Sequence, residues 1–230
     1  MAATEPIRDK KQLKALADYF LRRGELRNYA LVVIGASTAL RISDLLSLAW
    51  DDVCEPGHAG RAEAGSRAEA GNNAEAGNSA EAGSRAEAGG ELGQPVFRAH
   101  VTLIERKTGK EKAIALNGEA VHALRLCHEA RRGRHIFASN RQGGEPISRV
   151  QAWRIIRMGV EAVGIAGKVA SHSLRKTWGY HAWQSGRVSP VVIMDIYNHN
   201  SYETTRRYLG VAQDDLDRAY QCQSLFGLGK

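Results

Sequence analysis

Two histidines, an arginine and a tyrosine in the second half of the chain could act on an anionic group. In His172-Ser173-Leu174-Arg175, the histidine and the arginine are three residues apart, so a helix places both on one face. Arginine holds oxyanions with a planar charged fork, and a histidine with an ordinary pKa exchanges protons near neutral pH. The same tetrapeptide also fits the start of a surface helix capped by Ser171.

The second histidine and the tyrosine are nine residues apart, at His199 and Tyr208. Taken singly, a histidine between two helices is usually structural, and a tyrosine in a leucine-containing helix usually belongs to the core. These two residues indicate a catalytic function only in combination with other segments of the chain.

Two earlier segments complete the pattern. Thr38 to Leu48 reads TALRISDLLSL and contains Arg41 and Asp44, while Lys107 begins the turn sequence KTGK. In this order, the five groups resemble the motif boxes of the tyrosine recombinase (phage integrase) family. They match its first arginine box, its β-hairpin lysine, its His-x-Leu-Arg box, its closing histidine and its tyrosine nucleophile. The resemblance runs from about residue 9 to 226, outside one insertion.

The resemblance implies covalent cleavage of a DNA strand. Tyr208 would attack the scissile phosphate and form a 3′-phosphotyrosyl bond, which conserves the bond energy and needs no ATP. Arg41 and Arg175 would bind the nonbridging oxygens and stabilise the transition state. His199 would donate a further hydrogen bond to the phosphate, and His172 would accept the tyrosine proton.

A lysine and an aspartate complete the implied set of site residues. Lys107 would protonate the leaving 5′ oxygen, although Lys110 and Lys112 compete for this role on the same hairpin. Asp44, one helical turn after Arg41, would orient the site. With these cations in place, we expect no metal and no other cofactor, and the sequence shows no carboxylate cluster for Mg²⁺.

The chain departs from the family pattern at two turns. Many members have Gly before the first arginine, where this chain has Ala39, and Leu-Gly before the second histidine, where it has Tyr197-Asn198. Asparagine tolerates the left-handed conformation that glycine would supply, so we expect the second turn to survive.

The hydrophobic periodicity predicts the elements that position these residues. Residues 96–105 contain the β-favouring Val, Phe, Thr and Ile, and residues 111–116 alternate Ala with Ile and Leu, so the two segments predict a β-hairpin around the turn KTGK. Helical spacing is expected elsewhere, at 9–23, 28–37, 41–50, 118–132, 148–163, about 172–185, 190–197, 201–208 and 214–226. The fold class is therefore mostly α with a small antiparallel β-sheet, and the resemblance implies the tyrosine recombinase catalytic domain fold.

Residues 56–93 form a low-complexity insertion within a single catalytic domain that spans residues 1–230. The unit AEAG recurs there every six residues, and no large apolar residue occurs before Leu92. Such a segment cannot offset its ordering entropy by burial, so we expect a flexible surface insertion. It carries net charge −3, and removing its 38 residues leaves 192 residues with a net charge of +10.

Composition excludes several classes of protein. The 230 residues contain 32 basic and 25 acidic side chains, a net charge of +7 that suggests a polyanionic partner. Three widely spaced cysteines exclude a disulfide framework, and no apolar run reaches the roughly 20 residues that span a bilayer. We therefore expect no membrane association and a cytoplasmic, nucleoid-associated protein of bacterial or phage origin.

The leading functional prediction is a site-specific DNA recombinase that integrates, excises or inverts DNA. A type IB topoisomerase-like relaxing enzyme and a non-catalytic DNA-binding regulator are the alternatives. Only 40 residues precede Arg41, which suggests a catalytic-domain-only member with weak, salt-sensitive binding to double-stranded DNA. The expected partners are a second copy of the chain, docked through tail helix 214–226 into a homo-oligomer (a tetramer on DNA), and an accessory DNA-bending protein.

Overall fold

The computed structural model describes residues 4–56, 95–140 and 144–209, together with residues 211, 215, 217 and 220–222. Apart from Pro56, the predicted insertion 56–93 lies outside these residues. Most of the predicted tail helix 214–226 also lies outside them, although the backbone is helical at Asp215, Asp217, Tyr220 and Gln221.

The described part of the chain is mostly helical, with a single two-stranded antiparallel sheet, as the sequence predicted. The elements in chain order are α1 (Lys10–Arg22), α2 (Leu26–Ser37), α3 (Ile42–Leu46), α4 (Trp50–Val53), β1 (His100–Ile104), β2 (Glu111–Ala115), α5 (Gly118–Glu129), α6 (Arg149–Ala162), α7 (Ser171–Gln184), α8 (Pro190–Tyr197) and α9 (Tyr202–Leu209).

Local capping signals account for the starts of α1, α5, α6 and α8. The side chains of Asp9, Asn117, Ser148 and Ser189 each accept a hydrogen bond from the backbone of the first turn that follows. The predicted cap at Ser148 is therefore confirmed. At α7 the expected cap is wrong, because the helix is preceded by Ala170, whose backbone N–H donates to Ser173 Oγ.

The predicted helix over 41–50 is also wrong in its extent, because α3 ends at Leu46. The backbone of residues 48–50 leaves the helix and pairs with a distant segment instead. Leu48 accepts a hydrogen bond from the backbone N–H of Ile136, and Trp50 donates one to Arg134. A long-range backbone pairing of this kind outweighs helical periodicity and cannot be read from the local sequence.

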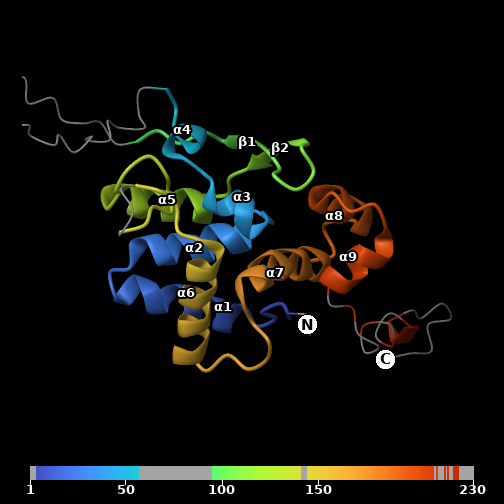
Figure 1. Cartoon of the computed structure of the whole chain (residues 1–230). Coiled ribbons are helices and arrows are strands. Elements are labelled where there is room, and N and C mark those ends of the chain that lie inside the picture. Colours follow the sequence, from blue (N-terminus) through green and yellow to red (C-terminus); the bar gives the residue numbers. More distant parts are fainter. Residues whose placement is uncertain are drawn as a thin grey trace, which may run out of the picture.

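The helices form one large hydrophobic core and one small satellite. The large core is built mainly from α1, α2, α5 and α6, with Phe20, Leu31, Leu124 and Ile156 among its fully buried side chains. Helix α7 runs between this body and the α8–α9 pair, and the β-hairpin reaches over from the other side towards α8 (Figure 1). Residues on α7, α8, α9 and the hairpin can therefore meet in one region.

The hairpin strands pair in antiparallel register, with Val101 opposite Ile114 and Ile104 opposite Glu111. The first strand is shorter than the predicted range 96–105, because Phe97 pairs with Cys54 instead. No helix among the described residues is long and apolar enough to cross a membrane.

We expect that deleting residues 57–92 will leave the fold intact. The two ends of the insertion are already joined, since Glu55 donates to the Val96 carbonyl and Arg98 donates to Val53. The deletion would leave a four-residue connection between Glu55 and Val96, and shortening a loop lowers the entropy cost of closing it. Urea denaturation should give a free energy of unfolding within about 1 kcal/mol of the parent. A larger loss of stability would show that the insertion contributes contacts to the fold.

Candidate active site

Helices α7 and α9 bring the predicted tyrosine against the His-x-Leu-Arg segment. His172 Nε2 lies 2.8 Å from Tyr208 Oη, and the two rings meet edge to face at 5.0 Å. The His199 ring lies on the same tyrosine, at 4.6 Å between ring centroids. Three predicted residues that are separated by up to 36 positions in the sequence thus form one cluster.

Arg175 is the largest fully buried side chain of this cluster, with 1% of its surface exposed. Its guanidinium donates to the carbonyls of Ala39 and Tyr197, the latter at 2.8 Å. The same guanidinium stacks over the Tyr197 ring at 4.5 Å and lies 5.9 Å from the Tyr208 ring. Within the described residues its Nε has no hydrogen-bond partner, so one charged donor stays available.

The two carbonyls that hold Arg175 belong to, or adjoin, left-handed turns. Asn198 has φ 54° and ends α8, so its predicted left-handed conformation is confirmed. Ala39 also has a positive φ of 56°, which explains the glycine that many family members carry there. An alanine in this conformation costs roughly 1 kcal/mol, and the carbonyl that it orients is the one that anchors Arg175.

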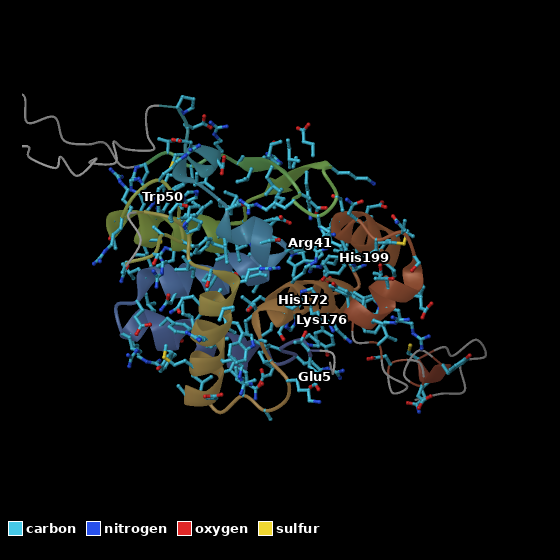
Figure 2. The ribbon with its side chains drawn as sticks, in the orientation of Figure 1. Glu5, Arg41, Trp50, His172, Lys176 and His199 are labelled. Carbon is cyan, nitrogen blue, oxygen red and sulfur yellow. The ribbon has the colours of Figure 1, made fainter. Side chains whose placement is uncertain are left out.

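Arg41 lies just before α3 and faces the same region from the other side (Figure 2). Its Nη1 lies 2.7 Å from Glu105 Oε2, and its Nη2 makes a long 3.5 Å contact with the Tyr197 carbonyl. Both arginines therefore converge on one carbonyl oxygen, that of Tyr197, which belongs to the last residue of α8.

The two acidic residues beside Arg41 connect helix α3 to the hairpin. Asp44 is 1% exposed and its Oδ1 accepts the backbone N–H of Arg106, one residue before the predicted lysine. Glu105 is equally buried and directly follows β1. Sequence reasoning included Asp44 but missed Glu105, whose position at a strand end gave no signal that it would be buried.

The hairpin presents three lysines near the cluster, in three different settings. Lys107 is exposed on the turn, Lys110 donates to Asn198 Oδ1 at 3.2 Å, and Lys112 donates to the Ile196 carbonyl at 2.6 Å. Burial and the nearby Arg175 lower the pKa of Lys112 to about 8. Lys107 makes no side-chain hydrogen bond within the described residues.

Two residues that sequence reasoning did not select support the histidine and the tyrosine. Buried Thr205 places its Oγ1 3.0 Å from His199 Nδ1, and Lys176 Nζ lies 5.5 Å from the Tyr208 ring centroid. Lys176 is itself held by the Thr4 carbonyl at 2.6 Å. Each of these residues adjoins a predicted motif, but only the fold shows that it contacts the site.

Burial, together with the nearby cations, keeps both histidines neutral. Burial, followed by the charges of Lys176 and Arg175, lowers the pKa of His172 from 6.5 to about 4. Burial and the same Arg175 charge, with that of Arg41, lower the pKa of His199 to about 4. At neutral pH, His172 can therefore accept a proton from the tyrosine hydroxyl next to it.

These two histidines should make the protein less stable as the pH falls from 6.5 towards 4. In that window the unfolded chain binds more protons than the folded chain, because folding lowers both pKa values. The free energy of unfolding should decrease by up to about 1.4 kcal/mol per pH unit for each histidine. Urea titrations across this range measure the slope, which His172→Gln and His199→Gln should each reduce. A slope that neither variant changes would contradict the assignment.

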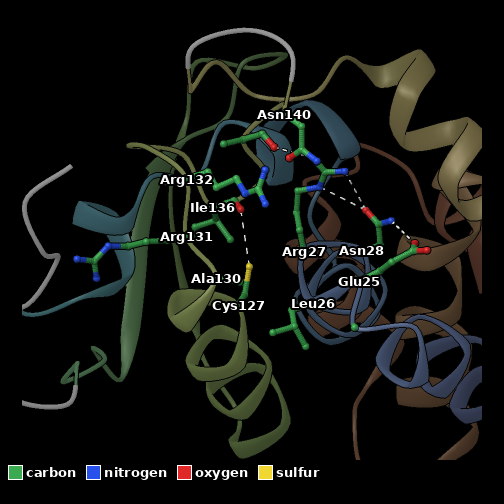
Figure 3. Close-up of a pocket in the computed structure, with 12 residues that line it drawn as sticks. Glu25, Leu26, Arg27, Asn28, Cys127, Ala130, Arg131, Arg132, Ile136 and Asn140 are labelled. Carbon is green, nitrogen blue, oxygen red and sulfur yellow. Dashed lines mark hydrogen bonds between the residues drawn. The ribbon is translucent and has the colours of Figure 1, made fainter. Parts of the chain in front are cut away.

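Three hollows on the described part of the surface contain none of the predicted residues. One cavity of about 300 Å³ lies between the start of α2 and the end of α5 (Figure 3). Its Arg27 already donates to the Ala138 carbonyl and to Asn28, which in turn donates to Glu25. In the described parts of the chain, no group of three or more His, Cys, Asp or Glu residues is placed to hold a metal ion.

A mostly helical domain with one antiparallel hairpin is the catalytic domain fold of tyrosine recombinases. The structure of XerA recombinase superposes with a TM-score of 0.63 and 19% identity, covering 96% of this chain and 64% of that one. The structure of XerH recombinase in a post-cleavage complex with its difH substrate gives the same TM-score at 13% identity, covering 96% and 54%. These likenesses establish the fold.

The family model described as "Phage integrase family" matches residues 92–214. The chain belongs to this family, and it is a site-specific DNA recombinase of the tyrosine type. It is 27% identical to the probable integrase/recombinase YoeC of Bacillus subtilis over 96% of this chain and 97% of that protein. It is 26% identical to the tyrosine recombinase XerD of Corynebacterium glutamicum over 86% of this chain, but it spans only 52% of that relative.

Proposed function

We propose that this recombinase cuts DNA through a covalent 3′-phosphotyrosyl intermediate, with Tyr208 as the nucleophile. The observation that carries the proposal is the 2.8 Å contact between Tyr208 Oη and the neutral His172, beside two guanidinium groups. The tyrosine oxygen attacks phosphorus, its proton passes to His172 Nε2, and the bond to the 5′ oxygen breaks. The phosphate bond energy is kept in the new ester, so resealing by a 5′ hydroxyl needs no ATP.

The two arginines and His199 would bind the phosphate during this step. Arg175 keeps its Nε free of other partners in the described residues. Arg41 pairs with Glu105 through Nη1, but its Nη2 makes only a long 3.5 Å contact with the Tyr197 carbonyl. Donors that are fixed before the reaction stabilise the charge of the pentacoordinate transition state without reorganisation. Neutral His199 can add a further N–H donor, with its ring oriented by Thr205.

The leaving 5′ oxygen requires a proton, which we assign to Lys107. Lys112 is already engaged with the Ile196 carbonyl, whereas Lys107 is exposed on a hairpin turn held by Asp44. Lys107 also contributes to the positive charge that lowers the pKa of both histidines, which supports this assignment. No cofactor is needed in this scheme.

Replacing Lys107 by Ala should slow cleavage of a normal duplex by about 10²–10³-fold. Activity should return on a duplex in which sulfur replaces the bridging 5′ oxygen, because a thiolate leaves without being protonated. Single-turnover cleavage of the two duplexes measures both effects. Lys112→Ala is the matched control and should show no rescue by sulfur. Rescue of Lys112→Ala in place of Lys107→Ala would transfer the role to Lys112.

Double-stranded DNA is the proposed substrate. Structures similar in fold include XerH on its difH substrate and a lambda integrase dimer on a core site. The net positive charge of the chain supports binding through phosphate contacts, which should weaken strongly as salt increases. We further propose that the chain acts as a single catalytic domain, assembles as a homo-oligomer through its tail, and cooperates with a DNA-bending protein in a cytoplasmic, nucleoid-associated setting.

Nicked suicide duplexes test the proposed chemistry. Such a duplex loses the short strand after cleavage, so the covalent intermediate accumulates. Candidate sites are the repeats that flank the gene and any mobile element around it. We expect a protein–DNA adduct that survives denaturation, resists metal chelators and maps to the peptide containing Tyr208. Relaxation of supercoils without strand exchange would favour the topoisomerase-like alternative, and DNA binding without any adduct would favour the regulator.

A further inference from the structure

Glu105 is a buried carboxylate on which three donors converge. Its Oε2 lies 2.7 Å from Arg41 Nη1, 2.8 Å from Thr108 Oγ1 and 3.1 Å from Asn198 Nδ2. Only 1% of the Glu105 surface is exposed. These donors come from three segments that are far apart in the sequence: the start of α3, the hairpin turn and the end of α8.

Each of the three segments carries a group that the proposed reaction uses. Arg41 is itself one of the phosphate-binding arginines, Thr108 follows Lys107, and Asn198 precedes His199. We propose that Glu105 is a positioning residue, which holds Arg41, the lysine turn and the histidine turn in their reactive arrangement before DNA arrives. This inference rests on the proposed function and extends it to a residue outside the motif boxes.

Charge gives a second reason for a carboxylate at this position. The positive charges of Arg41 and Arg175 both contribute to the lowered pKa values of His172, His199 and Lys112, so the site gathers like charges. Among the described residues, the only buried acidic side chains are Asp44 and Glu105. Burial raises the pKa of Glu105, but hydrogen bonds from Arg41, Asn198 and Thr108 outweigh this and lower it to about 2. The carboxylate is therefore ionised and offsets the repulsion.

Glu105 need not be displaced by the phosphate. A guanidinium has five N–H donors, and Glu105 occupies only the Nη1 side of Arg41. Of the other donors, Nη2 makes only the long 3.5 Å contact with the Tyr197 carbonyl, so it can also donate to a nonbridging oxygen. Since Thr108 and Asn198 also hold the carboxylate, it remains fixed while Arg41 binds both groups. A positioning role therefore fits the geometry better than an inhibitory one.

Glu105→Gln separates positioning from a merely structural role. We expect single-turnover cleavage of a saturating suicide duplex to fall about 10–100-fold, because a fixed donor network is lost. The affinity of the protein for the duplex should stay within a few-fold. Without DNA, the variant should bind inorganic phosphate more tightly, by about 3–10-fold in thermal-shift titrations, because one negative charge has been removed. A merely structural defect would weaken cleavage and phosphate binding together.

Two further measurements make the test decisive. Glu111→Gln, the same change at an exposed position of the same hairpin, is the matched control and should alter neither property. In an Arg41→Lys background, the effect of Glu105→Gln should shrink, because the carboxylate acts through Arg41. Fully multiplicative effects, or unchanged cleavage in Glu105→Gln, would overturn the proposal.

A fallback covers a glutamine variant that is too unstable to assay. Thr108→Ala lies at an exposed position and removes one donor to the carboxylate without changing charge. It should slow cleavage about 3–10-fold, and full activity in this variant would also overturn the proposal. Failure of the proposed function can be distinguished from failure of the Glu105 proposal. If the proposed function is wrong, the parent protein itself gives no adduct, whereas the phosphate titration tests Glu105 without any cleavage.

Discussion

Tyr208→Phe is expected to abolish the covalent protein–DNA adduct while leaving the fold intact. The substitution removes only the hydroxyl oxygen, which is the atom that attacks phosphorus in the proposed reaction. The other tyrosine of the cluster, Tyr197, is fully buried and donates its hydroxyl to the Arg175 carbonyl, so it cannot replace Tyr208 and the adduct should fall below detection. Gel separation of denatured reaction mixtures with a labelled suicide duplex measures the loss.

The fold should survive because the ring contacts of Tyr208 do not depend on its hydroxyl. The ring packs against His172, His199 and Tyr197, and Phe retains these contacts. The hydroxyl makes one hydrogen bond, to His172, so the free energy of unfolding should change by about 1 kcal/mol. Non-covalent affinity for the duplex should also be retained.

Tyr202→Phe is the matched control for this experiment. Tyr202 is also close to His199 in the sequence, but half of its surface is exposed and it begins α9. The control should form the adduct at the rate of the parent protein. An adduct that persists in Tyr208→Phe, or disappears in Tyr202→Phe, would show that the nucleophile has been assigned to the wrong tyrosine.

The sequence predicted those features of the fold that depend on local signals. Helix α6 begins after Ser148 as expected, and Asn198 takes the left-handed conformation that its residue type allows. By contrast, the early end of α3 depends on backbone pairing between residues 48–50 and 134–136. Periodicity reports which face of a helix is apolar, but it carries no information about such distant pairing.

The site shows the same division between local and tertiary information. The motif residues Arg41, His172, Arg175, His199 and Tyr208 could be selected because their types and order matched a known pattern. Glu105 could not be selected, because its burial arises from contacts with α3 and α8 that only the fold creates. The roles of all these residues stay predictions until the variants are measured.

Arg175→Lys is expected to lose both stability and cleavage. Arg175 is buried, and its guanidinium donates hydrogen bonds to the carbonyls of Ala39 and Tyr197, which are far apart in the sequence. A lysine has one ammonium on a flexible stem and cannot reproduce this planar fork or its stacking on Tyr197. We expect the free energy of unfolding to decrease by about 2–4 kcal/mol, as for other buried charged hydrogen bonds.

Cleavage by Arg175→Lys should fall at least about 10³-fold when it is assayed well below the melting temperature, because a fixed transition-state donor is lost. Arg41→Lys provides the comparison, since the Arg41 side chain is 17% exposed and lies at the rim of the same cluster. It should lose a similar factor in cleavage but much less stability. If Arg175→Lys unfolds more easily yet cleaves at the parent rate, then Arg175 only joins α7 to the turns at Ala39 and Tyr197. A loss of cleavage in both variants, with a loss of stability in one, would instead mean that the same guanidinium anchors the turns and binds the phosphate.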